Sequence, residues 1–119
     1  MPLPNHEKGA FGQKLAEDYL TAEGHVILAR NFRCPLGEID LISRDQEYIV
    51  FIEIKYRRTL ARGYPREAVG PGKRRTISRV AQYYIVRCGL ENQDYRFDVV
   101  EILGEMNPHA QITHIENAF

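Results

Sequence analysis

Two neighbouring stretches of this sequence place charged residues inside runs that are otherwise apolar. Glu38 and Asp40 lie in the first stretch, and Glu53 and Lys55 lie in the second. Buried strands are normally apolar, so carboxylates in such runs point to a site rather than to a core. Carboxylate oxygens suit Mg²⁺ or Mn²⁺. Such an ion can lower the pKa of a bound water and offset charge on a phosphoryl group, so the residue types indicate metal-assisted phosphoryl chemistry.

The elements that must position these side chains are two antiparallel strands, because residues at i and i+2 share a face of a strand. A hairpin with a two-residue loop at Asp45-Gln46 sets Asp40 opposite Phe51 and Glu38 opposite Glu53. Asp40 and Glu53 are then diagonal neighbours, about 7–8 Å apart at the backbone. The other face is predicted to be pure core, formed by Ile39, Leu41, Val50, Ile52 and Ile54. The alternative interpretation is an exposed strand edge with ordinary salt bridges.

The remaining periodicity predicts one α/β domain that spans residues 1–119. Apolar residues at helical spacing predict helices over Gly9–Glu23 and Lys73–Cys88. Runs rich in β-branched residues predict strands, over His25–Phe32, Glu38–Ser43, Glu47–Lys55, Tyr95–Leu103 and Gln111–Glu116. The order α-β-β-β-α-β predicts a mixed sheet flanked by helices.

The charge distribution indicates a nucleic-acid partner although the net charge is zero. The segment from Lys55 to Arg79 contains nine basic residues and one acid, Glu67, so it carries +8 and the remainder carries −8. A local field of this kind steers a polyanion. A solvated helix face beside an exposed loop is the alternative. The basic residues expected to contact nucleic acid are Arg57, Arg58, Lys73, Arg74 and Arg75.

Other classes of site find less support. The apolar runs are far shorter than the roughly 18–20 residues that span a bilayer, and the N-terminal segment does not resemble a signal peptide. We therefore expect a cytoplasmic protein without membrane contact. The histidines show no zinc spacing, and Ser43 has no evident histidine partner for nucleophilic catalysis. We expect His114 to lie at the surface.

The acidic motif resembles that of the PD-(D/E)xK nuclease superfamily, with Asp40 as its first acid and Glu53-Ile-Lys55 as its E-x-K. Over about residues 8 to 102 the chain resembles a YraN-like uncharacterised bacterial family more closely. That resemblance rests on ordered matches throughout, at Gly9, Gly12, Ala16, Tyr19-Leu20, Arg30–Arg33, Gly37–Ile42, Phe51–Lys55, Arg57-Arg58, Ala68-Val69, Lys73 and Arg96–Val100.

The resemblance implies a restriction-endonuclease-like αβββαβ core and a Mg²⁺- or Mn²⁺-dependent endonuclease acting on DNA, including branched or single-stranded forms. Asp40 and Glu53 would be metal ligands, the Ile54 carbonyl a third ligand, and Lys55 the catalytic lysine. Glu38 would be a supporting or second-metal ligand. Analogy with Holliday-junction resolvases, which share the implied fold, implies a homodimer.

One residue of the first helix departs from the family pattern. Family members usually have Glu after the glycine, whereas Gln13 follows Gly12 here. Glutamine offers only a neutral oxygen, and Glu17, one turn on, is the available substitute. The departure keeps open a non-catalytic nucleic-acid-binding module with the nuclease fold. A protein-interaction domain with no nucleic-acid role is the third hypothesis.

Overall fold

The computed structural model describes residues 5–57, 70–104 and 110–119. The elements follow the predicted order and are α1 (Asn5–Ala22), β1 (Val26–Cys34), β2 (Gly37–Asp45), β3 (Tyr48–Arg57), α2 (Pro71–Arg87), β4 (Asp94–Leu103) and β5 (Gln111–Ile115). α2 begins at Pro71, two residues before the predicted start at Lys73, because proline is well suited to the first position of a helix.

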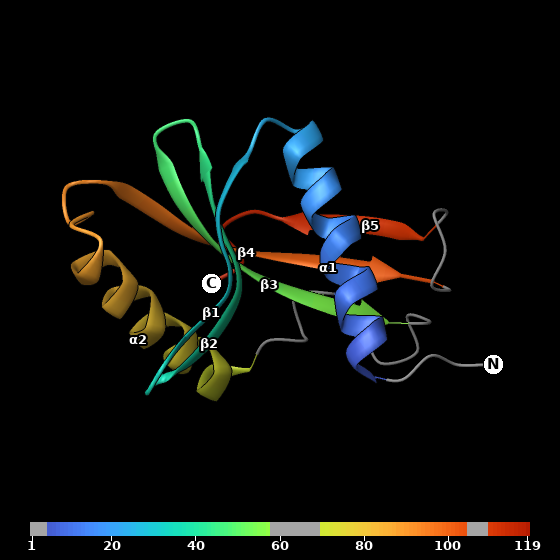
Figure 1. The fold of residues 1–119 in the computed structure, drawn as a ribbon, viewed down its shortest axis with the longest axis horizontal. Coiled ribbons are helices and arrows are strands. Elements are labelled where there is room, and N and C mark those ends of the chain that lie inside the picture. Colours follow the sequence, from blue (N-terminus) through green and yellow to red (C-terminus); the bar gives the residue numbers. More distant parts are fainter. Residues whose placement is uncertain (1–4, 58–69, 105–109) are drawn as a thin grey trace.

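The five strands form one mixed sheet in the order β1-β2-β3-β4-β5 (Figure 1). β3 and β4 pair in parallel, and the other neighbours are antiparallel. α2 provides the crossover between the two parallel strands. The predicted mixed α/β sheet is therefore confirmed, and β5 joins it as an edge strand.

The helices cover opposite faces of this sheet, because adjacent residues of β3 pack against different helices. Phe51 belongs to the cluster that contains Ile77 and Val80 of α2. Val50 and Ile52 belong to the cluster that contains Ala16 and Leu20 of α1. The other buried members of that cluster are Leu41, Val100 and Ile102. In the described part of the chain, neither helix is long and apolar enough to cross a membrane.

The β2–β3 register differs by two residues from the predicted one. Asp45 pairs with Tyr48, so the loop is Gln46-Glu47, and Gln46 takes a positive φ of 55°. A shift of two residues leaves each side chain on its face, whereas a shift of one would have reversed it. The structure therefore changes which residues are paired along β2 and β3, but not which face each side chain occupies. It brings Asp40 toward Glu53 itself rather than toward Phe51.

The expectation of one apolar and one polar face was wrong. Ile42, Ile49 and Phe51 share the face of Glu53 and are buried against α2. Ile39 also joins the α2 cluster instead of lying with Leu41. Both faces are covered by helices, so Asp40 and Glu53 are not part of a continuous polar face and lie instead at one end of this pair of strands.

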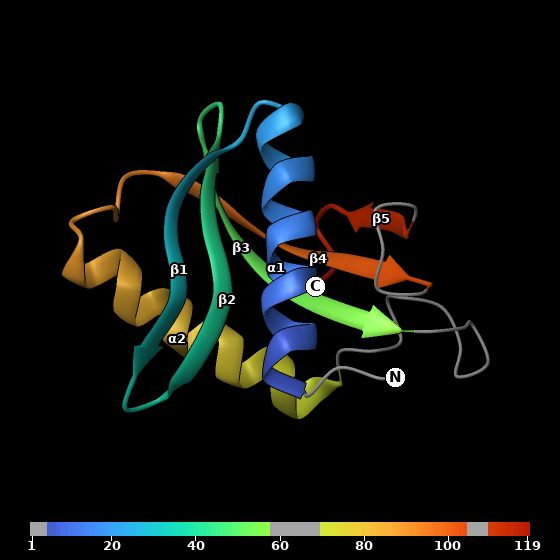
Figure 2. The same cartoon turned by 45° about the vertical axis from the view of Figure 1, so that its right-hand side comes forward.

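That end is the place where β2 and β3 separate. The last paired residues of the ladder are Leu41 and Ile52. Beyond them the β1–β2 hairpin bends toward α2 while β3 continues beside β4 (Figure 2). The divergence leaves a fork in the sheet, with Asp40 on one branch and Glu53 on the other.

Candidate acidic site at a fork in the sheet

The two strands are joined at the fork by a side chain instead of a backbone carbonyl. The backbone N–H of Ile54 donates to Oδ2 of Asp40 at 2.8 Å. The backbone pairing of β2 with β3 ends at Leu41 and Ile52. The Asp40 carboxylate therefore replaces the backbone carbonyl that would otherwise accept the Ile54 N–H. The bond fixes Asp40 next to Glu53, as the sequence motif predicted.

The environment of Asp40 disfavours its charge. Burial, followed by repulsion from Glu53, raises the pKa of Asp40 from 3.8 to about 6. The hydrogen bond from Ile54 and the charge of Lys73 act in the opposite direction. Glu53 is itself only 6% exposed. Two carboxyl groups thus share a largely buried site, and additional positive charge would reduce the repulsion between them.

Two lysines from different elements supply part of that charge. Nζ of Lys55, on β3, lies 3.5 Å from Oε1 of Glu53, and Nζ of Lys73, on α2, lies 3.3 Å from the same oxygen. Lys73 was predicted only as a nucleic-acid contact. Its position shows that the first turn of α2 belongs to the acidic site.

That first turn adds positive potential of its own. Gly70 is the N-cap and makes no side-chain capping hydrogen bond, and the first turn contains no acidic residue. The free N–H groups of a helix start therefore point out of α2 close to Lys73.

The structure does not bring Glu38 to this pair. Oε2 of Glu38 lies 3.4 Å from Nε of Arg33, on the neighbouring strand. In α1, Nε2 of Gln13 donates to Glu17 at 3.5 Å, and Glu17 accepts a 2.7 Å hydrogen bond from Arg30. These contacts tie the expected helix contributors to β1.

The side chains at the fork offer few donors for a metal ion. Within the described ranges, no group of three or more His, Cys, Asp or Glu side chains is arranged to hold one. Two carboxylates remain, which is a set that fits Mg²⁺, because this ion commonly keeps several waters and uses one or two carboxylates together with substrate phosphates. The crowded pair of Asp40 and Glu53 therefore fits a hard divalent ion whose other ligands come from outside the side chains.

The described basic residues line α2 outward from this site. Arg75 and Arg79 are exposed. Arg74 is half-buried, with its guanidinium 5.6 Å from the centre of the Phe119 ring. Arg57 ends β3, and Arg58 lies outside the described residues.

Sequence reasoning missed a buried polar network on the α1 face of the sheet. Asp98 is fully buried and accepts hydrogen bonds from Nε of Arg96 at 3.0 Å and from the backbone N–H of Asn117 at 3.1 Å. Its other oxygen lies 2.7 Å from Nε2 of His114. Despite burial, these partners hold the pKa of Asp98 below its ordinary value. The expectation that His114 lies at the surface was wrong, because its side chain is 6% exposed.

The same network gives Ser43 a histidine partner, contrary to the expectation. Oγ of Ser43 lies 2.8 Å from Nδ1 of His25, and Nε2 of His25 lies 3.5 Å from Asp45. Ser43 is completely buried, so a substrate cannot reach it. Burial also lowers the pKa of His25. The sequence did carry a signal for this network, because three polar residues interrupt otherwise apolar strands: Ser43, Arg96 and Asp98.

Comparison with known proteins places the whole chain. The model of an uncharacterised protein family, UPF0102, matches residues 12–102. A UPF0102 protein of Clostridium botulinum strain 657 is 46% identical over 117 residues, which cover 97% of this chain and 95% of that protein. A UPF0102 protein of Clostridium acetobutylicum is 47% identical over 116 residues, with the same coverage. The chain belongs to the UPF0102 family, the YraN-like family that its sequence resembles.

Proposed function

We propose that this protein is a divalent-metal-dependent phosphodiesterase that cleaves nucleic acid, with DNA as the expected substrate. The observation that supports the proposal most strongly is the fork itself. Asp40 and Glu53 arrive from separate strands and lie beside two lysines. Burial, followed by repulsion from Glu53, raises the pKa of Asp40 to about 6. A carboxyl group perturbed in this way is typical of functional sites.

In this proposal Asp40 and Glu53 hold the ion, Mg²⁺ or Mn²⁺. The Ile54 carbonyl is the third protein ligand, because a strand residue directs its N–H and C=O to the same edge and the Ile54 N–H points at Asp40. When bound, the ion would activate water and offset charge on the phosphoryl group. Glu38 has no direct role here, since it pairs with Arg33.

The lysines have separate tasks. Lys55 stands on the same face of β3 as Glu53, so its ammonium group can hold the attacking water or a phosphate oxygen. Lys73 comes from the start of α2, where backbone N–H groups also favour an anion. The scissile phosphate would therefore lie between the fork and the first turn of α2.

The charge distribution supports a polyanionic substrate. The +8 segment from Lys55 to Arg79 includes both site lysines, and it continues along α2 through Arg75 and Arg79. Lysine and arginine contacts to phosphates carry most sequence-independent affinity for nucleic acid. This surface would hold the strand whose backbone enters the fork.

Cleavage assays on single-stranded, duplex and branched DNA, with Mg²⁺ or Mn²⁺, test the proposal. We expect Asp40→Asn and Glu53→Gln to lower the cleavage rate by roughly 100-fold or more, and Lys55→Met to have a similar effect. Glu38→Gln is the matched control, because it removes a carboxylate from the same strand as Asp40 but outside the pair, and it should keep most activity. Equal cleavage by the wild-type protein and the Asp40 and Glu53 variants would overturn the proposal.

The contacts of α1 favour a second candidate, a module that binds nucleic acid without cleaving it. Gln13 replaces the acid expected from the family, and Glu17 is held by Arg30. This candidate requires salt-sensitive binding in the absence of cleavage with any divalent ion. The same substrate panel, measured for binding as well as cleavage, distinguishes the two.

A further inference from the structure

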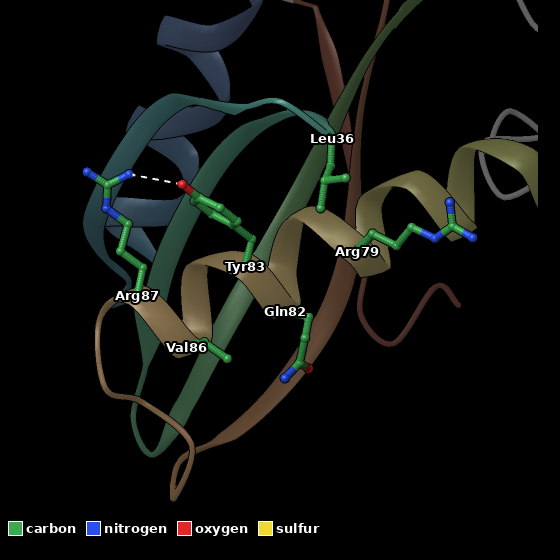
Figure 3. Close-up of a pocket in the computed structure, with 6 residues that line it drawn as sticks. All are labelled: Leu36, Arg79, Gln82, Tyr83, Val86 and Arg87. Atoms are coloured by element: carbon green, nitrogen blue, oxygen red, sulfur yellow. Dashed lines mark hydrogen bonds between the residues drawn. The ribbon is translucent and has the colours of Figure 1, made fainter.

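A shallow groove lies along α2, and its lining includes neither Asp40 nor Glu53. It has a volume of about 600 Å³ and is lined by Leu36, Arg79, Gln82, Tyr83, Val86 and Arg87. Figure 3 shows Arg79 and Arg87 at its two ends, with Leu36, from the β1–β2 turn, and Tyr83 between them. The groove is therefore built from two elements that the fold has already brought into contact.

The middle of the groove is apolar and open to solvent. Leu36 is 50% exposed and Val86 is 56% exposed. Single exposed apolar residues are ordinary, but a contiguous patch rimmed by polar groups usually marks an interaction site. Here two such residues and an aromatic ring line one recess whose volume is within the range of ligand sites.

The ends of the groove are positively charged. α2 contains five basic residues and no acidic residue. Arg79 and Arg87 border the recess. Guanidinium groups at both ends of an apolar recess are complementary to carboxylates on either side of an apolar side chain.

The aromatic ring does not suit a stacked nucleobase. The guanidinium of Arg87 lies 6.0 Å from the centre of the Tyr83 ring and donates to its hydroxyl at 3.3 Å. The Phe32 ring is 6.2 Å away, tilted by 45°. Base recognition by an unpaired strand depends on an open aromatic face. With its surroundings occupied in this way, Tyr83 is better suited to packing against an aliphatic or aromatic side chain at its edge.

A second copy of the chain is also a poor occupant. A twofold contact uses the same surface on both partners. It would place the arginines of one α2 against those of the other, and like charges across an interface are unfavourable.

We propose that the groove binds an acidic peptide segment of another protein. Apolar side chains of the peptide enter the recess between Leu36, Tyr83 and Val86, and its carboxylates pair with Arg79 and Arg87. This interaction does not require the acidic pair or its chemistry. It would recruit the protein to a partner through a surface that shares only Arg79 with the basic row proposed to hold nucleic acid.

Fluorescence anisotropy with a labelled synthetic peptide tests the proposal. The probe alternates aspartate with leucine and ends in phenylalanine, and the full chain is the titrant. We expect saturable binding by the wild-type protein and a loss of about 10-fold or more in affinity for the Leu36→Gln/Val86→Gln variant. Both side chains are at least half exposed, so this variant should fold, and circular dichroism verifies that it does.

Charge variants provide the second arm. Arg79→Gln should weaken binding about threefold to tenfold and reduce its salt dependence. Arg75→Gln is the matched control, since it removes an exposed arginine of the same helix outside the groove, and it should leave peptide affinity unchanged.

Several results would overturn the proposal. One is the absence of peptide binding by the wild-type protein, and another is equal binding by the groove variant. A labelled oligothymidylate that binds the wild-type protein but not the groove variant would assign the groove to nucleic acid. Concentration-dependent dimerisation that the groove variant abolishes would assign it to a second copy.

Discussion

Opposing effects determine the charge state of Asp40 in the folded protein. Its carboxylate accepts the Ile54 N–H, which favours the charged form, while burial and Glu53 disfavour that form more strongly. The folded protein therefore binds a proton at Asp40 more tightly than the unfolded chain does. A bound cation would favour the charged form of Asp40 and so would reverse this preference for the protonated form.

The first prediction concerns this proton. Because the pKa of Asp40 is raised from 3.8 to about 6 on folding, the free energy of unfolding should fall as the pH rises through this window in metal-free buffer. Asp40→Asn keeps an acceptor for Ile54 and removes the charge, so it should raise the free energy of unfolding at neutral pH by about 1–2 kcal/mol. Urea unfolding at a series of pH values measures both effects. A variant that is less stable than the wild type at neutral pH would contradict this interpretation.

The residues of the site differ in how far sequence alone could place them. Asp40, Glu53 and Lys55 stand out because charged residues interrupt apolar strands, and spacing by two puts neighbours on one face. The position of Lys73 depends on how α2 docks after a crossover, which local patterns do not encode. The contact between His25 and Ser43 has the same origin, since it joins residues 18 positions apart.

At the scale of elements, the fork depends on how the β1–β2 hairpin rests on α2. Gly37 has a positive φ of 149°, and a Cβ there would lie 2.8 Å from Cγ2 of Thr76 and 3.3 Å from Cγ2 of Val80. Only glycine allows this close approach without displacement of the helix. The hairpin can therefore bend away from β3 and leave the fork open.

The second prediction tests that contact. Gly37→Ala should lower the free energy of unfolding by about 1–3 kcal/mol, because the added methyl group meets α2 and the backbone conformation disfavours a side chain. Gly72→Ala is the matched control, since open space surrounds that position in the first turn of α2 and its φ is not positive. Thermal and urea unfolding compare the two. Equal stability of both variants would show that the hairpin does not depend on the close approach.

The third prediction concerns the junction of β4 and β5. Asp98→Asn leaves the buried guanidinium of Arg96 without its principal charge partner, so it should lower the free energy of unfolding by about 3 kcal/mol or more. Asp94→Asn changes an exposed residue of the same strand and should have little effect. Urea unfolding is again the measurement. A loss below about 1 kcal/mol for Asp98→Asn would mean that the network contributes little.

Element order was predictable, whereas register and faces were less so. Apolar periodicity located all the described helices and strands to within a few residues. The β2–β3 register was misplaced by two residues, because Asp45, Gln46 and Glu47 are all plausible turn residues and only the backbone of Gln46 decides between them. The burial of both faces of β2 and β3 was missed, because a single buried face already explained most of the alternation of apolar and polar residues in these strands.

At the scale of the whole molecule, zero net charge conceals a division between a basic segment and an acidic remainder. The described basic residues that follow the gap at 58–69 lead from Lys73, at the fork, along α2. Such a division directs a polyanion to one side of the protein and repels it elsewhere. The length predicted one domain and the order of the elements predicted an α/β fold, but the path of the described basic residues followed only from the position of α2.

The fourth prediction follows from this division. Affinity for duplex DNA should fall as salt increases, and Arg75→Gln should reduce the slope of log Kd against log salt concentration by about one. Lys14→Gln is the control, because Lys14 is exposed on α1 and pairs with Asp18 at 2.7 Å. Anisotropy titrations at several salt concentrations measure the slopes. An equal change for both variants would place the DNA on a different surface.

Calorimetric titration with Mn²⁺ is the decisive measurement of whether Asp40 and Glu53 together hold a divalent ion. The wild-type protein, in the presence of a non-cleavable DNA analogue, should bind a single ion per chain. The Asp40→Asn/Glu53→Gln variant should show no such binding, and the Glu38→Gln control should bind like the wild type. Equal binding by the wild-type protein and the double variant, or no binding by the wild-type protein with the DNA analogue present, would contradict the account.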